Sequence, residues 1–382
     1  MGTPSDRYMH RALLLAKRGA GQTSPNPAVG AVVVVGDEIV GSGWHRRAGT
    51  DHAEVLALRE AGAAAAGATL YVTLEPCSHH GRTPPCVDAV LGAGIRRVVA
   101  AMEDPDPRVA GTGIRALRDA GVAVEVGCGG TEAAALNEAY GLHRREGRPF
   151  VTYKAALSVD GRTSAADGTS QWITGPEARR DVQRVRARSD AICVGVGTVL
   201  ADDPSLTVRD ARPARTARPP LRVVVDSRGR TPLSAQVLDA SAPTLIAVTQ
   251  AAPAPAVAAL QAVGAEVVCL ADQAHGDRVP LPALLAYLGR REIVSLLLEG
   301  GATLAGSFVA GGLVDRYLFY LAPVLLGAGC PDQGSAGHGA GGPVAAGRGV
   351  LEGWTAGTIG AAPRLKVRQV RRVGPDLRVE LR

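Results

Sequence analysis

Aromatic residues are scarce in this chain, since Phe, Trp and Tyr together make up 3% of its 382 residues. The hydrophobic cores must therefore be built mostly from Val, Leu, Ile and Ala. Sequence-specific RNA-binding proteins stack bases on aromatic side chains, so this scarcity argues against RNA as a partner. The formal net charge is +6, but the basic residues are interspersed with acidic ones and form no run of five or six. Such a mildly basic surface suits small phosphorylated substrates, and we expect no nucleic-acid partner.

Long apolar runs are also missing. No stretch reaches the roughly 18 residues that span a membrane. The first apolar run, residues 12–16, is too short for a secretory signal and is followed by Lys17 and Arg18. A myristoylation signal needs Ser or Thr at position six, where Asp6 stands. The sequence therefore predicts a cytoplasmic protein with no membrane partner.

Cysteine is sparse, with six in the chain. Cys193 and Cys269 lie in strand-like apolar runs, where cysteine is usually a small buried hydrophobic residue. Cys77 and Cys86 are close together in the sequence. In a cytosolic chain, such a pair indicates a metal site or catalysis before it indicates a disulfide.

The pattern of helices and strands predicts two domains, and the chain is longer than one typical domain. Helix and strand patterns alternate along residues 6–126, which predicts an α/β layered domain with a mainly parallel sheet. A polar, Arg-rich helix over residues 137–148 is interpreted as the link, because Gly147 and Pro149 are typical of a helix end. A second α/β alternation starts at Phe150. The expected domains are residues 1–147 and 148–382.

The expected elements of the first domain are helices at residues 6–18, 51–61, 86–91 and 113–120 and strands at 28–35, 38–41, 69–74, 97–101 and 122–126. In the second domain, strands are expected at residues 151–155, 191–196, 221–226, 244–248, 266–270, 295–299 and 316–321. Helices fall between most of them. Residues 327–349 are rich in Gly, Ala and Pro, which predicts a loop.

The most specific motif is His-Ala-Glu at residues 52–54, followed by Pro-Cys at residues 76–77 and by Cys86. His52, Cys77 and Cys86 offer three zinc ligands and leave a fourth position for water, as a catalytic zinc site requires. Zinc lowers the pKa of bound water from 15.7 to about 7. Glu54 can take the released proton and pass it to a leaving amine. This order of residues is the signature of zinc nucleobase deaminases, so we expect one catalytic Zn²⁺ per chain.

Eight residues separate the two cysteines, where the common nucleobase-deaminase spacing has two. The run PCSHHGRTPPC at residues 76–86 closely resembles the cysteine loop of bifunctional riboflavin biosynthesis deaminase–reductases. PNPAVG at residues 25–30 and DPDP at residues 104–107 are similar to the same family, in which Asn is more common at the position of Asp106. The resemblance covers nearly all of the chain.

The resemblance implies a cytidine-deaminase-like α/β/α domain over residues 1–147. The implied reaction removes the ring 2-amino group of 2,5-diamino-6-ribosylamino-4(3H)-pyrimidinone 5′-phosphate. Asn26 would hold this substrate near the zinc. His79 and Arg82 would reach its ribose phosphate, although either can instead be an ordinary solvated side chain.

The second domain carries no Gly-x-Gly-x-x-Gly, so a Rossmann fingerprint is not supported. A Gly-rich turn at residues 299–306 would bring backbone amides to a phosphate, but alone this signal is weak. KAALSVDGR at residues 154–162, SQWITG at 170–175 and GTVLADDP at 197–204 resemble the reductase domain of the same family. The resemblance implies a dihydrofolate-reductase-like α/β domain over residues 148–382. That domain would use NADPH to reduce the ribosyl group of 5-amino-6-(5-phosphoribosylamino)uracil to ribityl.

The resemblance also implies residue roles in the second domain. The expected cofactor-binding residues are Ala156, Trp172, Thr198, Asp202, Gly301, Ala302, Thr303, Leu304, Ala305, Gly306 and Ser307, with Ser227, Arg228 and Arg230 as candidates for the 2′-phosphate of NADPH. The expected substrate-binding residues are Ser170, Arg186, Leu206, Arg209 and Glu299. Arg186 and Arg209 are expected as phosphate clamps, because guanidinium groups bind phosphate in a bidentate fork. Asp202 is the first candidate for the proton donor and Lys154 the second. A homo-oligomer is expected from the family.

Other interpretations predict different behaviour. The second domain would be non-catalytic in a deaminase-only enzyme, or would grip RNA in a nucleic-acid deaminase. A zinc-stabilised binding module would need no Glu54, but a closed structural site lacks an obvious fourth ligand, with only His79, His80 and Cys128 to spare.

Overall fold

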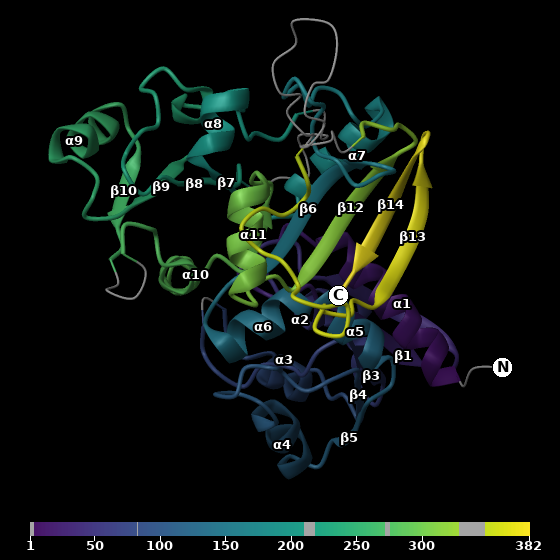
Figure 1. Ribbon diagram of the computed structural model, residues 1–382. Helices are drawn as coiled ribbons and strands as arrows, with labels where there is room; N and C mark the ends of the chain where they lie inside the picture. Colours follow the sequence, from purple (N-terminus) through teal and green to yellow (C-terminus); the bar gives the residue numbers. More distant parts are fainter. Residues whose placement is uncertain (1–3, 82, 210–217, 272–275, 328–347) are drawn as a thin grey trace, which may run out of the picture. The chain divides into compact units, whose positions relative to one another are not determined.

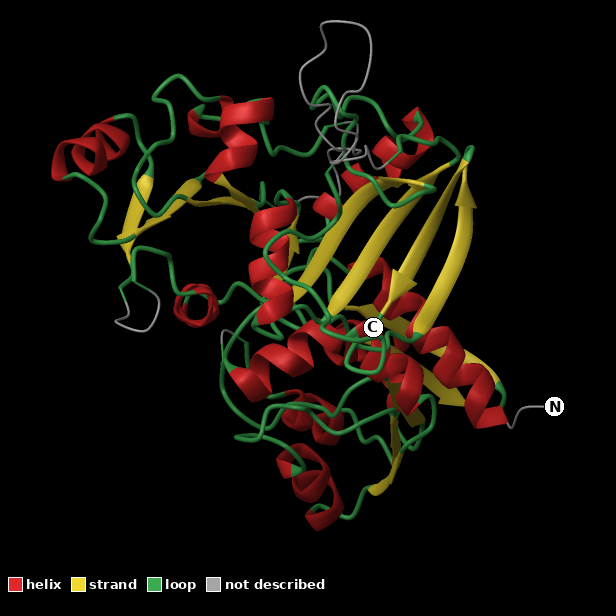
Figure 2. Cartoon of the chain, viewed as in Figure 1, coloured by secondary structure: helices red, strands yellow, loops and turns green. Residues whose placement is uncertain are grey.

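The computed structural model describes residues 4–81, 83–209, 218–271, 276–327 and 348–382 (Figures 1 and 2). By its internal contacts the chain divides into two compact units. Most of the first unit precedes Phe150, and most of the second unit follows from Phe150 onward. No helix in these described ranges is both long and apolar enough to cross a membrane.

The first unit contains a five-stranded sheet in the order β2-β1-β3-β4-β5. Its strands are β1 (Gly30–Val35), β2 (Glu38–Trp44), β3 (Thr69–Val72), β4 (Arg97–Ala100) and β5 (Ala123–Val126). Its helices are α1 (Pro4–Gly19), α2 (Ala53–Ala61), α3 (Cys86–Gly92), α4 (Thr112–Asp119), α5 (Gly130–Leu136) and α6 (Glu138–Glu146), with a short 3₁₀ helix η1 (Gly62–Ala65).

The prediction of a mainly parallel sheet was wrong for half of the strand pairings in the first unit. β1 runs antiparallel to both β2 and β3, whereas the β3–β4 and β4–β5 pairs are parallel. The β1–β2 pairing has a local cause, because Gly36 and Asp37 alone join the two strands and Gly36 has a φ of 57°. A two-residue turn that starts with a left-handed glycine makes an antiparallel hairpin.

Helices cover both faces of this sheet. Successive strand residues point to opposite faces, so Ala31 and Val33 of β1 pack in the core with α2, α3 and α4. Val32 and Val34 pack instead with α1 and with Ala133 of α5. This arrangement makes the three α/β/α layers that were expected for the first domain.

The second unit contains a nine-stranded sheet in the order β10-β9-β8-β7-β11-β6-β12-β14-β13. Its strands are β6 (Phe150–Ser158), β7 (Ala191–Gly195), β8 (Leu221–Val225), β9 (Thr244–Val248), β10 (Glu266–Cys269), β11 (Ser295–Leu298), β12 (Arg316–Ala322), β13 (Val367–Val373) and β14 (Asp376–Leu381). Its helices are α7 (Pro176–Arg186), α8 (Val196–Asp202), α9 (Ala254–Ala262), α10 (Leu281–Arg290) and α11 (Ala302–Ala310), with a 3₁₀ helix η3 (Gln236–Leu238). The seven strands from β10 to β12 pair in parallel.

All seven strands predicted for the second domain are present, but the sequence did not predict β13 and β14. These two strands form an antiparallel pair beside β12. Six of the seven residues of β13 are exposed. A strand with no buried face lacks the alternation of polar and apolar residues on which such a prediction depends.

Cysteine burial was predicted correctly at one of two positions. Cys193 is buried in β7, as expected. Cys269 is exposed, because it ends β10, the edge strand of the sheet. Cys330 and residues 328–347 of the expected Gly/Ala-rich loop lie outside the described residues.

Candidate active sites

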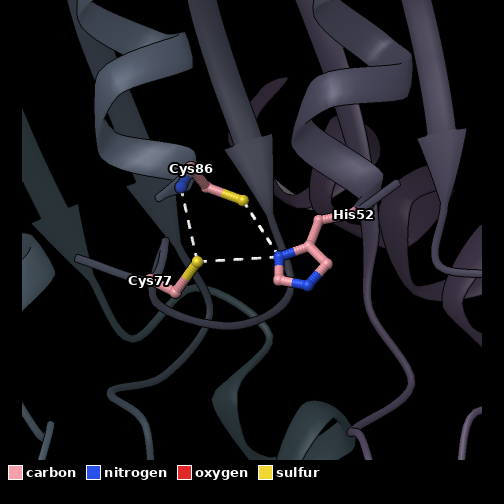
Figure 3. Close-up of side chains that lie close together, drawn as sticks. All are labelled: His52, Cys77 and Cys86. Carbon is pink, nitrogen blue, oxygen red and sulfur yellow. Dashed lines mark hydrogen bonds between the residues drawn. The ribbon is translucent and has the colours of Figure 1, made fainter. Parts of the chain in front are cut away.

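Three segments of the first unit bring His52, Cys77 and Cys86 together (Figure 3). His52 immediately precedes α2 and Cys86 is the first residue of α3. Cys77 lies in the loop that follows β3. Helix N-termini carry partial positive charge, which favours a thiolate and other anions at this point.

The three side chains fit a zinc ion. Their ligand atoms all lie within 4.8 Å of one another, and no fourth His, Cys, Asp or Glu of the described residues joins the group. His52 Nδ1 is 3.1 Å from Cys86 Sγ and 3.6 Å from Cys77 Sγ. Zn–N bonds of about 2.0 Å and Zn–S bonds of about 2.3 Å in a tetrahedron place ligand atoms roughly 3.5–4 Å apart. Three protein ligands leave a position open, as in catalytic zinc sites.

Hydrogen bonds already favour a thiolate at Cys77. The Cys86 thiol, the Cys86 backbone N–H at 3.3 Å and the His52 ring all lie beside its sulfur. These contacts outweigh burial and lower the pKa of Cys77 to about 4. The same pairing, together with burial, raises the pKa of Cys86.

Glu54 lies in the first turn of α2 and is 3% exposed. Burial raises the pKa of its carboxyl group above the ordinary value, and the nearby His52 opposes this effect. With Asn26 and His79, Glu54 lines a cavity of about 490 Å³ that also contains His52 and Cys77. Thus the structure brings Asn26, His79 and Glu54 to the predicted zinc ligands, whereas Arg82 lies outside the described residues.

His45 is a residue of this cavity that the sequence analysis missed. The His45 ring is buried. Its Nε2 lies 3.1 Å from Asn26 Nδ2, and its Nδ1 lies 3.2 Å from the Asp51 carbonyl oxygen. Burial lowers the pKa of His45. A neutral ring with its proton on Nδ1 satisfies both contacts and holds the Asn26 side chain in the cavity. The only sequence signal was a histidine four positions after the strand expected at residues 38–41.

Glu75, beside Pro76 and Cys77, organises the loop on one side of the cavity. Its carboxylate accepts hydrogen bonds from four backbone N–H groups, those of Asp104, Gly111, Gly113 and Ile114. An added Cβ at Gly113 would lie 1.9 Å from the Pro76 carbonyl oxygen, so this close approach requires glycine. The loop it fixes presents Asp106 to the cavity. Asp106 is held there by Arg108, whose Nη2 lies 2.6 Å from its carboxylate.

A second cavity, of about 1330 Å³, lies within the second unit. Most residues to which the resemblance gave roles line it: Lys154, Ala156, Ser170, Trp172, Arg186, Thr198, Asp202, Leu206, Arg209, Glu299, Gly301, Ala302, Thr303 and Leu304. Six candidates, Ala305, Gly306, Ser307, Ser227, Arg228 and Arg230, are not among its lining residues. Ala305 and Gly306 are buried in α11. The Ser227 hydroxyl accepts from Val279 N, and Arg228 pairs with Asp277.

Three largely buried charged residues meet in this second cavity. Arg186 donates to both Glu299 carboxylate oxygens, from Nε at 2.7 Å and from Nη2 at 2.9 Å. Lys154 Nζ lies 3.9 Å from Glu299 Oε2. Burial alone would raise the pKa of Glu299, but Arg186 and Lys154 outweigh it and hold this pKa at about 2. Burial lowers the pKa of Lys154.

Backbone amides at the start of α11 also face the second cavity. Gly301 precedes this helix, and its N–H donates to Thr198 Oγ1 at 3.1 Å. A helix N-terminus of this kind favours phosphate groups. Nearby, the Arg179 guanidinium lies over the exposed Trp172 ring, 4.6 Å from the ring centroid. Asp202 ends α8 at the rim of the same cavity, and burial raises its pKa.

The α/β/α layers and the His–Cys–Cys cluster define the first unit as a zinc-binding deaminase domain. It is joined to an α/β domain with a cavity of about 1330 Å³. Residues 3–102 match the cytidine and deoxycytidylate deaminase zinc-binding region, and residues 149–377 match the RibD C-terminal domain. The chain is 44% identical over 383 residues to the riboflavin biosynthesis protein RibD of Escherichia coli, covering 98% of each. With RibD of Bacillus amyloliquefaciens it shares 42% identity over 375 residues, 97% of this chain and 94% of the relative.

Two solved structures agree over the whole chain. Form 1 of Acinetobacter baumannii RibD has a TM-score of 0.86 at 39% identity, covering 99% of this chain and 98% of that one. A deaminase/reductase from Thermotoga maritima has a TM-score of 0.82 at 32% identity with the same coverage. The chain belongs to the RibD family of bifunctional riboflavin biosynthesis deaminase–reductases. This membership confirms the predicted fold class and bifunctional enzyme. It favours them over the deaminase-only, RNA-deaminase and binding-module interpretations.

Proposed function

We propose that residues 1–147 deaminate 2,5-diamino-6-ribosylamino-4(3H)-pyrimidinone 5′-phosphate and that residues 148–382 then reduce the ribosyl group of 5-amino-6-(5-phosphoribosylamino)uracil with NADPH. The T. maritima relative is named for a deaminase and a reductase of this pair of compounds. The observation that carries the proposal is that Glu54 lines one cavity with His52 and Cys77, whose ligand atoms lie within 4.8 Å of each other and of Cys86 Sγ.

In the first unit, His52, Cys77 and Cys86 would hold the zinc. When bound, zinc supplies Lewis acidity that lowers the pKa of water at its open position from 15.7 to about 7. Glu54 takes one proton from the attacking water and delivers it to the departing amine. Asn26, held by His45 at 3.1 Å, orients the pyrimidine ring. His79 and Arg82 bind the ribose phosphate.

In the second unit, NADPH when bound supplies the hydride that reduces the ribosyl carbon. Gly301 and Thr198, at the N-terminus of α11, would hold its phosphates. Trp172, Ala156, Asp202 and residues 302–304 complete this side of the cofactor site. Ala305, Gly306 and Ser307 do not line the cavity and would support it from within α11. Ser227, Arg228 and Arg230 stay our candidates for the 2′-phosphate.

The remaining side of the second cavity binds the substrate. Ser170, Leu206 and Glu299 contact the pyrimidine and sugar, and Arg209 clamps the phosphate. Arg186 already uses two donors on Glu299 and a third on the Thr207 carbonyl oxygen. We therefore assign Arg186 to orienting Glu299 as well as to binding substrate. Asp202 or Lys154 gives the proton that ring opening requires.

We further infer that the chain self-associates and acts in the cytoplasm on small phosphorylated pyrimidines. Light scattering on the purified protein tests the first inference, and a single-subunit mass would contradict it. Fractionation of cells tests the second, and recovery of the enzyme outside the cytoplasmic fraction would contradict it.

The test of both activities uses zinc-loaded protein and the diaminopyrimidine ribotide, with and without NADPH. We expect ammonia release in both cases, followed by loss of the absorbance of reduced nicotinamide only when NADPH is present. Ammonia release without NADPH consumption, even from the deaminated compound, would contradict the reductase assignment. NADPH consumption from the deaminated compound by protein that releases no ammonia would contradict the deaminase assignment.

A further inference from the structure

Thr83 lies between the two zinc-ligand cysteines and contacts the outer side of the His52 ring. Its Oγ1 is 3.2 Å from His52 Nε2. The other ring nitrogen, Nδ1, faces the two sulfurs at 3.1 and 3.6 Å. We propose that Thr83 is a positioning residue that fixes the orientation and the proton of the zinc ligand His52. This inference rests on the zinc site of the proposed function.

The chemistry of imidazole gives the hydrogen bond its direction. A ring nitrogen that binds a metal offers its lone pair, so the proton must be on the other nitrogen. Because Nδ1 faces the sulfurs, it is the nitrogen that would bind the zinc. With zinc bound, Nε2 would carry the proton and donate it to Thr83 Oγ1. Such an outer partner holds the ring in place and makes the ligand nitrogen more basic.

The neighbouring His45 does not replace Thr83 in this role. Its ring packs edge-on against His52, with centroids 5.2 Å apart. Both of its nitrogens are already used, one by Asn26 and the other by the Asp51 carbonyl oxygen. The contact restricts the His52 ring sterically, whereas Thr83 supplies the hydrogen bond.

The long spacing between the cysteines explains how Thr83 reaches this position. Eight residues separate Cys77 from Cys86, compared with two in the common nucleobase deaminases. Gly81 N donates to Thr83 O at 3.2 Å, and α3 begins three residues after Thr83, at Cys86. Thr83 is the sixth residue after Cys77, a position that a two-residue spacing does not contain. The extra loop length therefore gives the metal ligand an outer partner in addition to any contact with substrate.

A matched pair of variants separates the hydroxyl from the shape of the side chain. Thr83→Val keeps the branched shape and removes the hydroxyl, whereas Thr83→Ser keeps the hydroxyl. Zinc affinity of the full-length proteins is measured by competition with a chromophoric chelator, and the visible spectrum of the cobalt-loaded proteins reports ligand geometry. We expect Thr83→Val to bind zinc about 10–100-fold more weakly and to show an altered cobalt spectrum. Thr83→Ser should match the unmodified protein in both measurements.

The melting temperature of the zinc-free proteins controls for folding, and we expect it to be the same for all three. An unchanged affinity in Thr83→Val, or an equal loss in both variants, would overturn the role of Thr83 while the zinc site stands. Failure of the unmodified protein to bind zinc would overturn both the zinc site and this inference.

Discussion

The two candidate active sites are built in different ways. The zinc cluster needs three ligand atoms within 4.8 Å of one another, beside a cavity of about 490 Å³. The second cavity, of about 1330 Å³, is lined by residues spread from Tyr153 to Glu352. A metal site concentrates its chemistry in a few residues of uncommon type, whereas a site for a dinucleotide and a sugar phosphate distributes binding over many ordinary residues. Single substitutions should therefore cost more activity in the first unit than in the second.

Two buried glutamates illustrate the same contrast. Glu54 has no basic partner strong enough to offset its burial, and its pKa is raised. The Glu299 side chain is also largely buried, but it is paired with Arg186 and Lys154, which hold its pKa at about 2. A carboxyl group with a raised pKa is suited to exchanging protons, whereas a permanently ionised one is suited to holding charged or hydroxyl groups in place.

The largest effect is expected from Glu54→Gln. The amide keeps the shape of the side chain but cannot carry a proton, so deamination should fall by about 10²–10⁴-fold. Zinc content, measured by metal analysis, should stay at one per chain, and reduction of the deaminated compound should proceed at the unmodified rate. Deamination that survived this change with zinc bound would remove Glu54 from the chemistry.

Glu299→Gln should lower the stability of the second unit in a pH-dependent way. The pKa of Glu299 is about 2 in the folded chain against an ordinary 4.5. Its ionisation therefore contributes stability that is fully present above pH 4.5 and is lost as the pH falls through about 2. At pH 7 the free energy of unfolding of the Glu299→Gln variant should be about 3 kcal/mol below that of the unmodified protein. This difference should narrow as the pH falls toward 2.

Urea unfolding at several pH values measures this gap. Glu177→Gln is the matched control, because Glu177 pairs with Arg180 on the exposed surface of α7. Exposed pairs contribute about 0–1 kcal/mol, so the control gap should be small. A Glu299→Gln gap that stayed constant from pH 7 to acid would contradict the ionised pair.

Lys154→Met should lower the rate of reduction by about 10²-fold, because it removes a positioned ammonium group next to Glu299. Met preserves the length and the apolar stem of the side chain. Deamination by the same protein is the internal control and should be unchanged. Equal losses in both activities would indicate a folding defect instead of a role in reduction.

The zinc site could be predicted from sequence because His52, Glu54, Cys77 and Cys86 carry their chemistry in residue type and spacing. Their outer partners could not, because His45, Glu75 and Thr83 act through contacts that the fold creates. Glu75, for example, accepts hydrogen bonds from backbone N–H groups that lie 29 to 39 positions further along the chain. Residues of the second cavity were found through resemblance alone, since Ala156, Thr198 and Leu206 have no distinctive chemistry.

The fold shows the same division between local and long-range information. Buried strands such as β7 and β9 can be recognised in the sequence as apolar runs. All of the strands that the sequence predicts are present. β13 could not be recognised because its exposed residues include Arg368, Arg371 and Arg372. It is held by its pairing with β14 and by the contact of Arg371 with the buried Asp181 at 2.6 Å.

The smallest effect is expected from Asp202→Asn, which decides between two roles at the rim of the second cavity. Burial raises the pKa of Asp202, and a carboxyl group acts as an acid only below its pKa. If Asp202 donates the proton, kcat for reduction falls about tenfold in the variant, less than the usual 10²–10⁴-fold for a general acid, because water reaches this exposed residue and replaces it in part. The loss of rate that accompanies rising pH then disappears. If it only binds NADPH, the KM for NADPH rises while kcat is unchanged. Asp203→Asn is the neighbouring control, because the Asp203 carboxylate already accepts the Gln236 N–H at 2.8 Å. We expect kcat to fall. A rise in the KM for NADPH with unchanged kcat would instead assign the proton donor to Lys154.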